Sequence, residues 1–244
     1  MAKRVHQKEF KRVETKYLIS NHQRRQLLSD LGKHMEADDF AQSTITSLYF
    51  DTEQFDMIQD SLAKKYGKEK VRLRTYEMES DLDMPAFLEI KQKIDGVGYK
   101  YRIKTTPRQA AILMASDADK VVEDKRLASQ LEKLHQRYGV IKPSMLIAYK
   151  RLSFRGKKDK SVRVTLDMNM TYAVVNQLTM IGHESFPLLP DQQLIMEVKV
   201  AEQIPDWLEN ILHQYKLEKN SFSKYGHAYG LYRSGSLLEE VHHA

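Results

Sequence analysis

Hydrophobic and polar residues alternate along much of this chain, and this period of two predicts β-strands. The strand-like runs cover residues 13–19, 45–51, 70–78, 86–94, 99–104, 145–154, 161–169 and 194–200, with 172–180 as a continuation. Apolar residues at helical spacing predict helices over 20–35, 54–63, 107–116, 120–138, 205–215 and 223–231. Because the order is not an alternating βαβ order, we expect an α+β protein whose antiparallel sheet is curled or closed.

Each predicted strand carries its charged residues on one face, because alternate side chains of a strand point to the same side. The charged positions are Glu14, Lys16, Arg72, Arg74, Glu89, Lys91, Lys93, Lys100, Arg102, Lys104, Arg151, Glu197 and Lys199. The simplest interpretation is an antiparallel sheet with one solvated face. The alternative is a barrel with a polar lumen and an apolar exterior that helices cover.

Three observations favour the barrel. The opposite faces are apolar, as Leu88 and Ile90 illustrate, and several amphipathic helices are available to cover them. Cations outnumber acids on the charged faces, and an acid recurs two residues before a lysine, as in Glu89 and Lys91. Buried cations are costly without partners. A phosphate chain, a metal ion and carboxylates inside the lumen would supply those partners.

The composition limits the classes of ligand and chemistry. The formal charge of +6 fits an anionic ligand. The absence of cysteine excludes disulfides, thiolate metal sites and cysteine nucleophiles. The first residues form no apolar signal segment, and no apolar run approaches the roughly 18 residues of a membrane helix. We therefore expect a soluble protein of the cytoplasm.

Eight short motifs follow one another along the chain. They are Arg12-Val-Glu14-Thr-Lys16-Tyr17, Ser47-Leu-Tyr-Phe-Asp51, Val71-Arg-Leu-Arg74, Leu88-Glu-Ile-Lys91, Tyr149-Lys-Arg151, Val162-Arg-Val-Thr-Leu-Asp167, Ile195-Met-Glu197-Val-Lys199 and Ser221-Phe-Ser-Lys224-Tyr225. In this combination the chain resembles the VTC domain, the polyphosphate polymerase branch of the triphosphate tunnel metalloenzymes. The resemblance implies one domain over residues 1–244, with its core at about 10–231. The implied fold is α+β, an eight-stranded antiparallel β-barrel tunnel with a cationic lumen and helices packed outside.

The resemblance also implies roles for individual residues. The catalytic cations would be Arg72, Arg74, Lys91, Lys100, Arg151, Arg163 and Lys199, and the further substrate-binding residues would be Lys16, Lys93, Tyr149 and Lys224. Arginine offers paired donors to phosphate oxygens, whereas lysine offers a point charge. Glu197 is the first candidate metal ligand and Glu14 the second, because Mn²⁺ and Mg²⁺ prefer carboxylate and phosphate oxygens.

The implied activity is an ATP-dependent polyphosphate polymerase, a phosphotransferase that moves the ATP γ-phosphate to inorganic polyphosphate. Two alternatives stay open, namely a metal-dependent tri- or polyphosphate hydrolase and a non-catalytic module that binds polyphosphate or nucleic acid. Hydrolytic members of the superfamily carry Glu-x-Glu-x-Lys on the first strand, and Arg12 stands here in place of the first glutamate. This departure favours the polymerase. Tyr99 and Tyr101 alternate with the cations, so they face away from them, which argues against base stacking with nucleic acid. The sequence does not indicate the oligomeric state.

Overall fold

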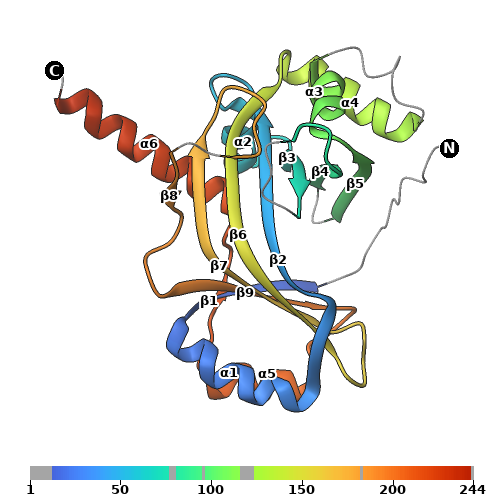
Figure 1. Cartoon of the computed structure of the whole chain (residues 1–244), viewed down its shortest axis with the longest axis vertical. Helices are drawn as coiled ribbons and strands as arrows, with labels where there is room; N and C mark the ends of the chain where they lie inside the picture. Colours follow the sequence, from blue (N-terminus) through green and yellow to red (C-terminus); the bar gives the residue numbers. More distant parts are fainter. Residues whose placement is uncertain (1–12, 77–80, 95–96, 116–123, 182–183, 243–244) are drawn as a thin grey trace.

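The computed structural model describes residues 13–76, 81–94, 97–115, 124–181 and 184–242. Its strands form one antiparallel sheet in the order β10-β1-β9-β7-β6-β2-β3-β4-β5, with β8 paired to β7 (Figure 1). The strands are β1 (Val13–Ser20), β2 (Met35–Asp51), β3 (Lys68–Thr75), β4 (Ala86–Ile94), β5 (Val97–Thr105), β6 (Lys142–Gly156), β7 (Arg163–Val174), β8 (Phe186–Pro187), β9 (Gln193–Val200) and β10 (Lys219–Asn220). The predicted α+β class and antiparallel sheet are therefore confirmed.

The sheet is strongly twisted, and the predicted closure into an eight-stranded barrel is not seen. Within the described part of the chain, no ladder joins β5 at one end of the sheet to β1 or β10 at the other. The central strands β2 and β6 are 17 and 15 residues long. Their twist carries β1 and β9 across the end of the long strands (Figure 1). The sheet therefore curls around its charged face without a continuous hydrogen-bonded wall.

Six helices are described; most of them cover the outer faces of the sheet, and the last one packs on its inner face against Tyr49 and Tyr149. They are α1 (Asn21–His34), α2 (Asp56–Ala63), α3 (Pro107–Ala115), α4 (Lys125–Tyr138), α5 (Asp206–Gln214) and α6 (Lys224–His242). Ser20 caps α1 as predicted. Its side-chain oxygen accepts from the backbone N–H of Gln23, and the Gln23 side-chain oxygen accepts from the backbone N–H of Ser20. None of the described helices is long and apolar enough to cross a membrane.

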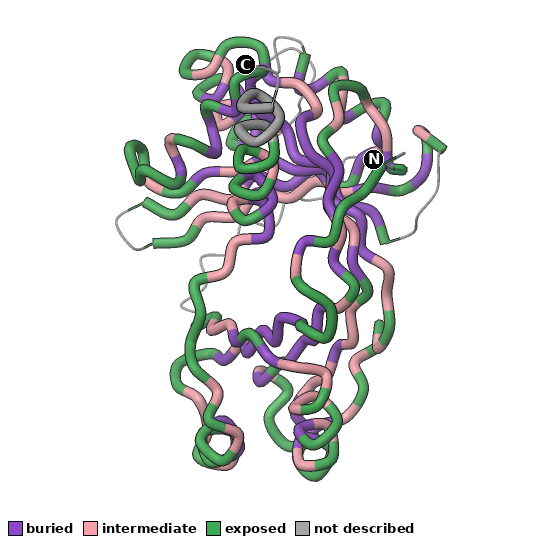
Figure 2. The backbone as a smooth tube through the Cα atoms, turned by 90° about the vertical axis from the view of Figure 1, so that its left-hand side faces the viewer, coloured by how far each residue is buried: buried purple, intermediate pink, exposed green. Residues whose placement is uncertain are grey.

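The apolar strand faces point outward and are covered by helices, as predicted. Leu88 and Ile90 of β4 pack in one cluster with Leu131 of α4, and both strand residues are fully buried. At the other end of the sheet, Val198 of β9 packs with Leu27 of α1 and with residues of α5. Buried residues run along the central strands, whereas the helices carry exposed residues on their outer sides (Figure 2). Burying one such aliphatic side chain contributes about 1.5–3 kcal/mol, so these clusters fix which face of each strand turns inward.

Two predicted strand boundaries were wrong for identifiable reasons. β2 begins at Met35 rather than at residue 45, and its polar first part pairs with β6 through ion pairs such as Glu36–Arg155. Such cross-strand charge pairs stabilise a strand that lacks apolar alternation. The runs 161–169 and 172–180 form one strand, β7, which ends at Val174. The non-glycine left-handed residue Asn169 (φ 50°) lies inside β7 and conceals its continuity in the sequence pattern.

Candidate functional site

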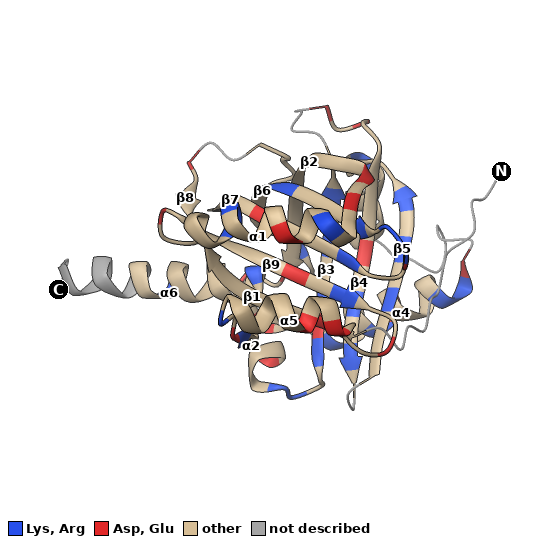
Figure 3. Cartoon of the chain, turned by 90° about the horizontal axis from the view of Figure 1, so that it is seen from below, with Lys and Arg blue, Asp and Glu red and all other residues tan. Residues whose placement is uncertain are grey.

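The charged strand faces meet on the inner side of the curled sheet. Seen from below, basic and acidic residues lie together along β3, β4, β5 and β9 (Figure 3). We call this region the charged interior. It contains two groups of side chains, each built around buried carboxylates, and both arise directly from the period-two pattern of the strands.

The first group is the Glu89 cluster, formed by Glu89, Arg72, Arg74, Lys100 and Arg102. The Glu89 carboxylate is fully buried. It accepts from Arg72 Nε at 2.8 Å, and Arg72 Nη2 and Lys100 Nζ each lie 2.7 Å from one of its oxygens. Arg102 Nε lies at 3.6 Å and Arg74 Nη1 at 4.0 Å. One carboxylate therefore compensates four cations. The two closest are Arg72, on Oε2, and Lys100, on Oε1.

Strand register explains this cluster. Arg72 of β3 stands opposite Glu89 of β4, which stands opposite Arg102 of β5. Burial would raise the pKa of the Glu89 carboxyl, but the charges of Arg72, Arg74 and Lys100 outweigh burial and hold that pKa far below its ordinary range. Glu89 therefore stays ionised at any physiological pH.

The second group is the Asp167–Glu197 cluster, formed by Asp167, Glu197, Arg151, Lys16, Lys199 and Lys224. Asp167 is fully buried on β7. Arg151 of β6 binds it with two parallel bonds, from Nε at 2.6 Å and from Nη2 at 2.7 Å. Lys224, the first residue of α6, donates at 2.6 Å to Asp167 Oδ2, the oxygen that also accepts from Arg151 Nη2. Paired guanidinium bonds of this kind fix direction as well as charge, so Arg151 is held rigidly.

Glu197 of β9 is the centre of the same cluster. Its oxygens lie 2.9 Å from Lys199 Nζ, 3.4 Å from Arg151 Nη2, 3.5 Å from Lys224 Nζ and 3.7 Å from Lys16 Nζ. Burial would raise the pKa of Glu197, but the charges of Lys199, Lys224, Arg151 and Lys16 keep it well below its ordinary range. The two carboxylates thus hold four cations from four elements toward one space.

Tyrosine hydroxyls support the arginines of the Glu89 cluster. Arg72 Nη1 donates to the Tyr49 hydroxyl at 3.3 Å, and Arg74 Nη2 donates to the Tyr149 hydroxyl at 3.4 Å. Tyr149 was predicted to donate to phosphate, and its ring also lies under Lys224 Nζ, 4.8 Å from the ring centroid. Among the described residues, the polar contacts of Arg74 are 3.4 to 4.0 Å long, so its guanidinium is held less tightly than that of Arg72.

Two lysines of the interior have no carboxylate within 4 Å among the described residues. Lys91 was predicted as a site residue, but Lys70 was missed. They stand opposite each other on β3 and β4. The charge of Arg72, together with burial, lowers the pKa of Lys91 well below its ordinary value, and Glu89 and then Glu14 of β1 oppose this shift. This interaction indicates that β1 lies near β4 across the interior, although no described ladder pairs the two strands.

Two predicted site residues lie at the edge of the interior. Arg163 is exposed at the start of β7 and forms an ion pair with Asp38 of β2. Lys93 is exposed near the end of β4. Arg12, which bears on the choice between polymerase and hydrolase, lies outside the described residues.

The candidate metal ligands Glu14 and Glu197 lie on the paired strands β1 and β9. Lys16 Nζ stands between them, 3.9 Å from a Glu14 oxygen and 3.7 Å from a Glu197 oxygen. No three acidic or histidine side chains converge anywhere in the described ranges. Mg²⁺ is commonly held by one or two carboxylates together with substrate phosphates. The two glutamates fit that mode of binding and do not form a site made by protein ligands alone.

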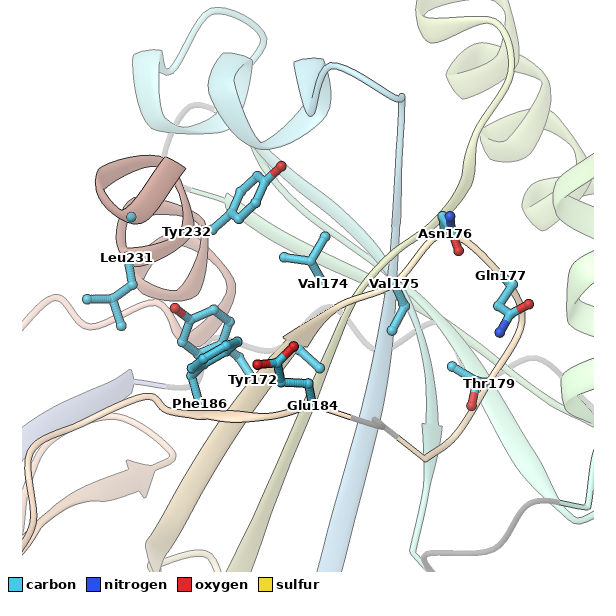
Figure 4. A pocket seen from close by; sticks show the side chains of 12 residues that line it. Tyr172, Val174, Val175, Asn176, Gln177, Thr179, Glu184, Phe186, Leu231 and Tyr232 are labelled. Carbon is cyan, nitrogen blue, oxygen red and sulfur yellow. The ribbon is translucent and has the colours of Figure 1, made fainter. Parts of the chain in front are cut away.

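A separate hollow of about 530 Å³ lies between the chain after β7, β8 and α6 (Figure 4). Aromatic and aliphatic side chains line it, among them Tyr172, Phe186 and Leu231, together with the amides of Asn176 and Gln177. No lysine or arginine is among its described lining residues. It is therefore chemically unlike the charged interior and unsuited to a phosphate chain.

Comparison with known proteins agrees with this geometry. The Schizosaccharomyces pombe vacuolar transporter chaperone complex subunit 4 is 25% identical over 91% of this chain, which spans 37% of that relative. A Bacillus halodurans crystal structure, provisionally described as an adenylate cyclase, has a TM-score of 0.53 at 12% identity, covering 86% of this chain and 92% of that one. At that identity the likeness shows the fold alone. The pattern of the VTC domain matches residues 11–232, and the chain therefore belongs to the VTC domain family.

Proposed function

We propose that this chain is a polyphosphate polymerase that transfers the γ-phosphate of ATP to the end of an inorganic polyphosphate chain. The observation that carries the proposal is the charged interior, where eight cations surround three buried carboxylates. A polyanion is the ligand that such an excess of cations suits. The similarity to a vacuolar transporter chaperone subunit supports the same choice.

The reaction asks little of acid–base chemistry. The attacking group is a terminal oxygen of the polyphosphate chain, which is already anionic. Its bond to the γ-phosphorus forms as the bond to the β–γ bridging oxygen breaks, and ADP leaves with that electron pair. The protein contributes positioning and charge stabilisation. Arg74, Lys100, Lys199 and Arg151 are the groups we assign to the phosphate oxygens, because their charges are held by the buried carboxylates and face the interior.

The two carboxylate clusters have a positioning role in this proposal. Arg151 is clamped by Asp167 and Arg72 by Glu89, so neither guanidinium must be ordered when substrate arrives. Lys100 and Lys199 each have one close carboxylate contact and remain partly exposed, which lets their ammonium groups turn toward a ligand. Pre-organised charges of this kind lower the cost of ordering during binding.

Glu197 and Glu14 are the residues we assign to Mn²⁺ or Mg²⁺, in combination with the phosphates of ATP. A bound divalent ion would neutralise charge on the β- and γ-phosphates. Glu14 is the more accessible ligand, with a side chain 40% exposed, whereas that of Glu197 is 8% exposed. Glu197 must exchange at least one lysine contact to bind a metal ion.

A nucleic-acid-binding module is disfavoured by the position of the aromatic residues. Tyr101 is buried in the core cluster behind β5, and Tyr99 packs against the same cluster. Lys100 and Arg102 lie on the other face of that strand. Base stacking beside phosphate contacts needs aromatic residues and cations on one face.

The test is incubation of the purified protein with ATP and Mn²⁺ or Mg²⁺, followed by electrophoresis of the products. We expect a ladder of polyphosphate chains together with ADP. Free phosphate without chain growth would identify a hydrolase. Tight polyphosphate binding with no turnover under either metal would identify a binding module.

A further inference from the structure

Lys70 occupies an unusual position in the charged interior. It lies on β3 and shares its inward face with Arg72 and Arg74 because the three residues alternate along the strand. Its side chain is half-buried, and its Nζ lies 3.5 Å from the Ser223 hydroxyl. Ser223 directly precedes Lys224, which belongs to the Asp167–Glu197 cluster. Lys70 therefore stands between the two carboxylate clusters.

The surroundings of Lys70 are cationic. The charged or titratable groups that face it are Lys91, its partner on β4, together with Tyr49 of β2, Arg72 of β3, Lys16 of β1 and Lys224 of α6. Burial and the last three of these groups lower the pKa of Lys70 to about 8, and Tyr49 opposes the shift. Lys16 and Lys224 have carboxylate partners, whereas Lys70 has none within 4 Å in the part of the chain that the structure describes.

We propose that Lys70 binds one phosphate unit of the triphosphate or polyphosphate chain, at a position between the Glu89 and Asp167–Glu197 clusters. The proposal rests on the proposed function and adds a specific residue and position to it. A half-buried lysine surrounded by cations destabilises the unliganded protein, because no carboxylate compensates its charge. A phosphate unit would compensate it and could accept from the neighbouring lysines and from Ser223 at the same time.

Substitution with methionine separates binding from folding. Lys70→Met keeps the length of the side chain and removes the charge. We expect its thermal midpoint without ligand to equal or exceed that of the wild type, because an uncompensated cation is lost. We expect its affinity for tripolyphosphate, measured by calorimetry without ATP or metal, to fall about 10- to 100-fold, the range of one charge-assisted hydrogen bond. Lys68→Met, at an exposed position on the same face of β3, is the matched control and should change affinity less than about threefold.

Proton uptake supplies a second readout. An anion favours the charged form of Lys70, whereas protons released by tripolyphosphate itself are common to both proteins. On binding tripolyphosphate at pH 8, the net proton uptake of the wild type should therefore exceed that of Lys70→Met. Calorimetry in two buffers of different ionisation enthalpy measures this difference.

The two ideas can fail separately. If the wild type binds tripolyphosphate and Lys70→Met binds it as tightly as Lys68→Met does, the assignment of Lys70 is wrong while the proposed function stands. If the wild type does not bind tripolyphosphate, the proposed function fails first and the assignment falls with it.

Discussion

Replacing Glu89 with glutamine should destabilise the unliganded protein strongly. The carboxylate is fully buried, and its loss leaves Arg72 and Arg74, each with a side chain about 10% exposed, without a buried counter-charge. Lys100 and Arg102 are 37% and 31% exposed and can turn to water. We therefore count one broken buried pair, which costs about 3–5 kcal/mol. In a chain of this size that is a fall of about 6–20 °C in the thermal midpoint.

The assay is chemical or thermal unfolding at pH 7, with and without tripolyphosphate. Glu202→Gln, at an exposed position, is the control and should stay within about 0.5 kcal/mol of the wild type. Saturating tripolyphosphate should restore a large part of the stability of Glu89→Gln, because the anion replaces the missing charge. A tripolyphosphate concentration one hundred times its dissociation constant raises the free energy of unfolding by about 2.7 kcal/mol. A loss below about 1 kcal/mol would refute the view that Glu89 compensates the arginines.

The pH dependence of the same variant has a defined sign. The folded-state pKa of Glu89 lies below its unfolded value, so its contribution is fully present above the unfolded pKa of about 4.3. It is lost progressively as the pH falls below that value toward the folded pKa. The stability difference between wild type and Glu89→Gln should therefore stay constant from pH 7 to about pH 5 and shrink at lower pH. A difference that shrinks already between pH 7 and pH 6 would contradict the assigned ionisation.

Three further predictions concern single residues. Arg74→Ala should keep the fold and lower the rate of chain synthesis at least about 100-fold. Arg163→Ala, at the exposed edge, should lower that rate less than about tenfold. Equal losses would show that a position in the interior does not decide which arginines act in synthesis. Glu197→Gln should abolish synthesis together with its metal dependence, and an unchanged metal titration would show that another carboxylate binds the ion. Tyr225→Phe removes the hydroxyl that donates to buried Asp51 at 2.7 Å and should cost about 1–3 kcal/mol in urea unfolding; a smaller cost would mean that the three amide donors to Asp51 already suffice.

The sequence pattern was sufficient wherever the period of two was unbroken. The predicted strand 86–94 has the bounds of β4, and the inward face of Glu89 and Lys91 follows from its alternation with Leu88 and Ile90. The pattern failed for the first part of β2, where ion pairs replace apolar contacts. Lys70 could have been found by extending the alternation of Arg72 and Arg74 one step back.

The assembly of the site could not be predicted from local patterns. Lys224 comes from a helix and reaches Asp167, 57 residues earlier in the chain, only because α6 begins beside β7 and β9. The curl of the sheet places Glu14 within electrostatic range of Lys91 although their strands are not paired. Such distances depend on twist and register summed over many strands, and no short motif encodes them.

The charged interior also accounts for the net charge of the whole chain. The two clusters contain eight lysines and arginines and three acids. Lys70, Lys91 and Glu14 lie beside them, so the interior holds ten cations and four acids, a surplus of six positive charges. That surplus equals the formal charge of the whole chain, +6. All other residues therefore carry equal numbers of positive and negative charges. A polyanion that reaches the charged interior therefore meets the whole formal excess of the chain, whereas one that contacts only other residues meets charges that sum to zero.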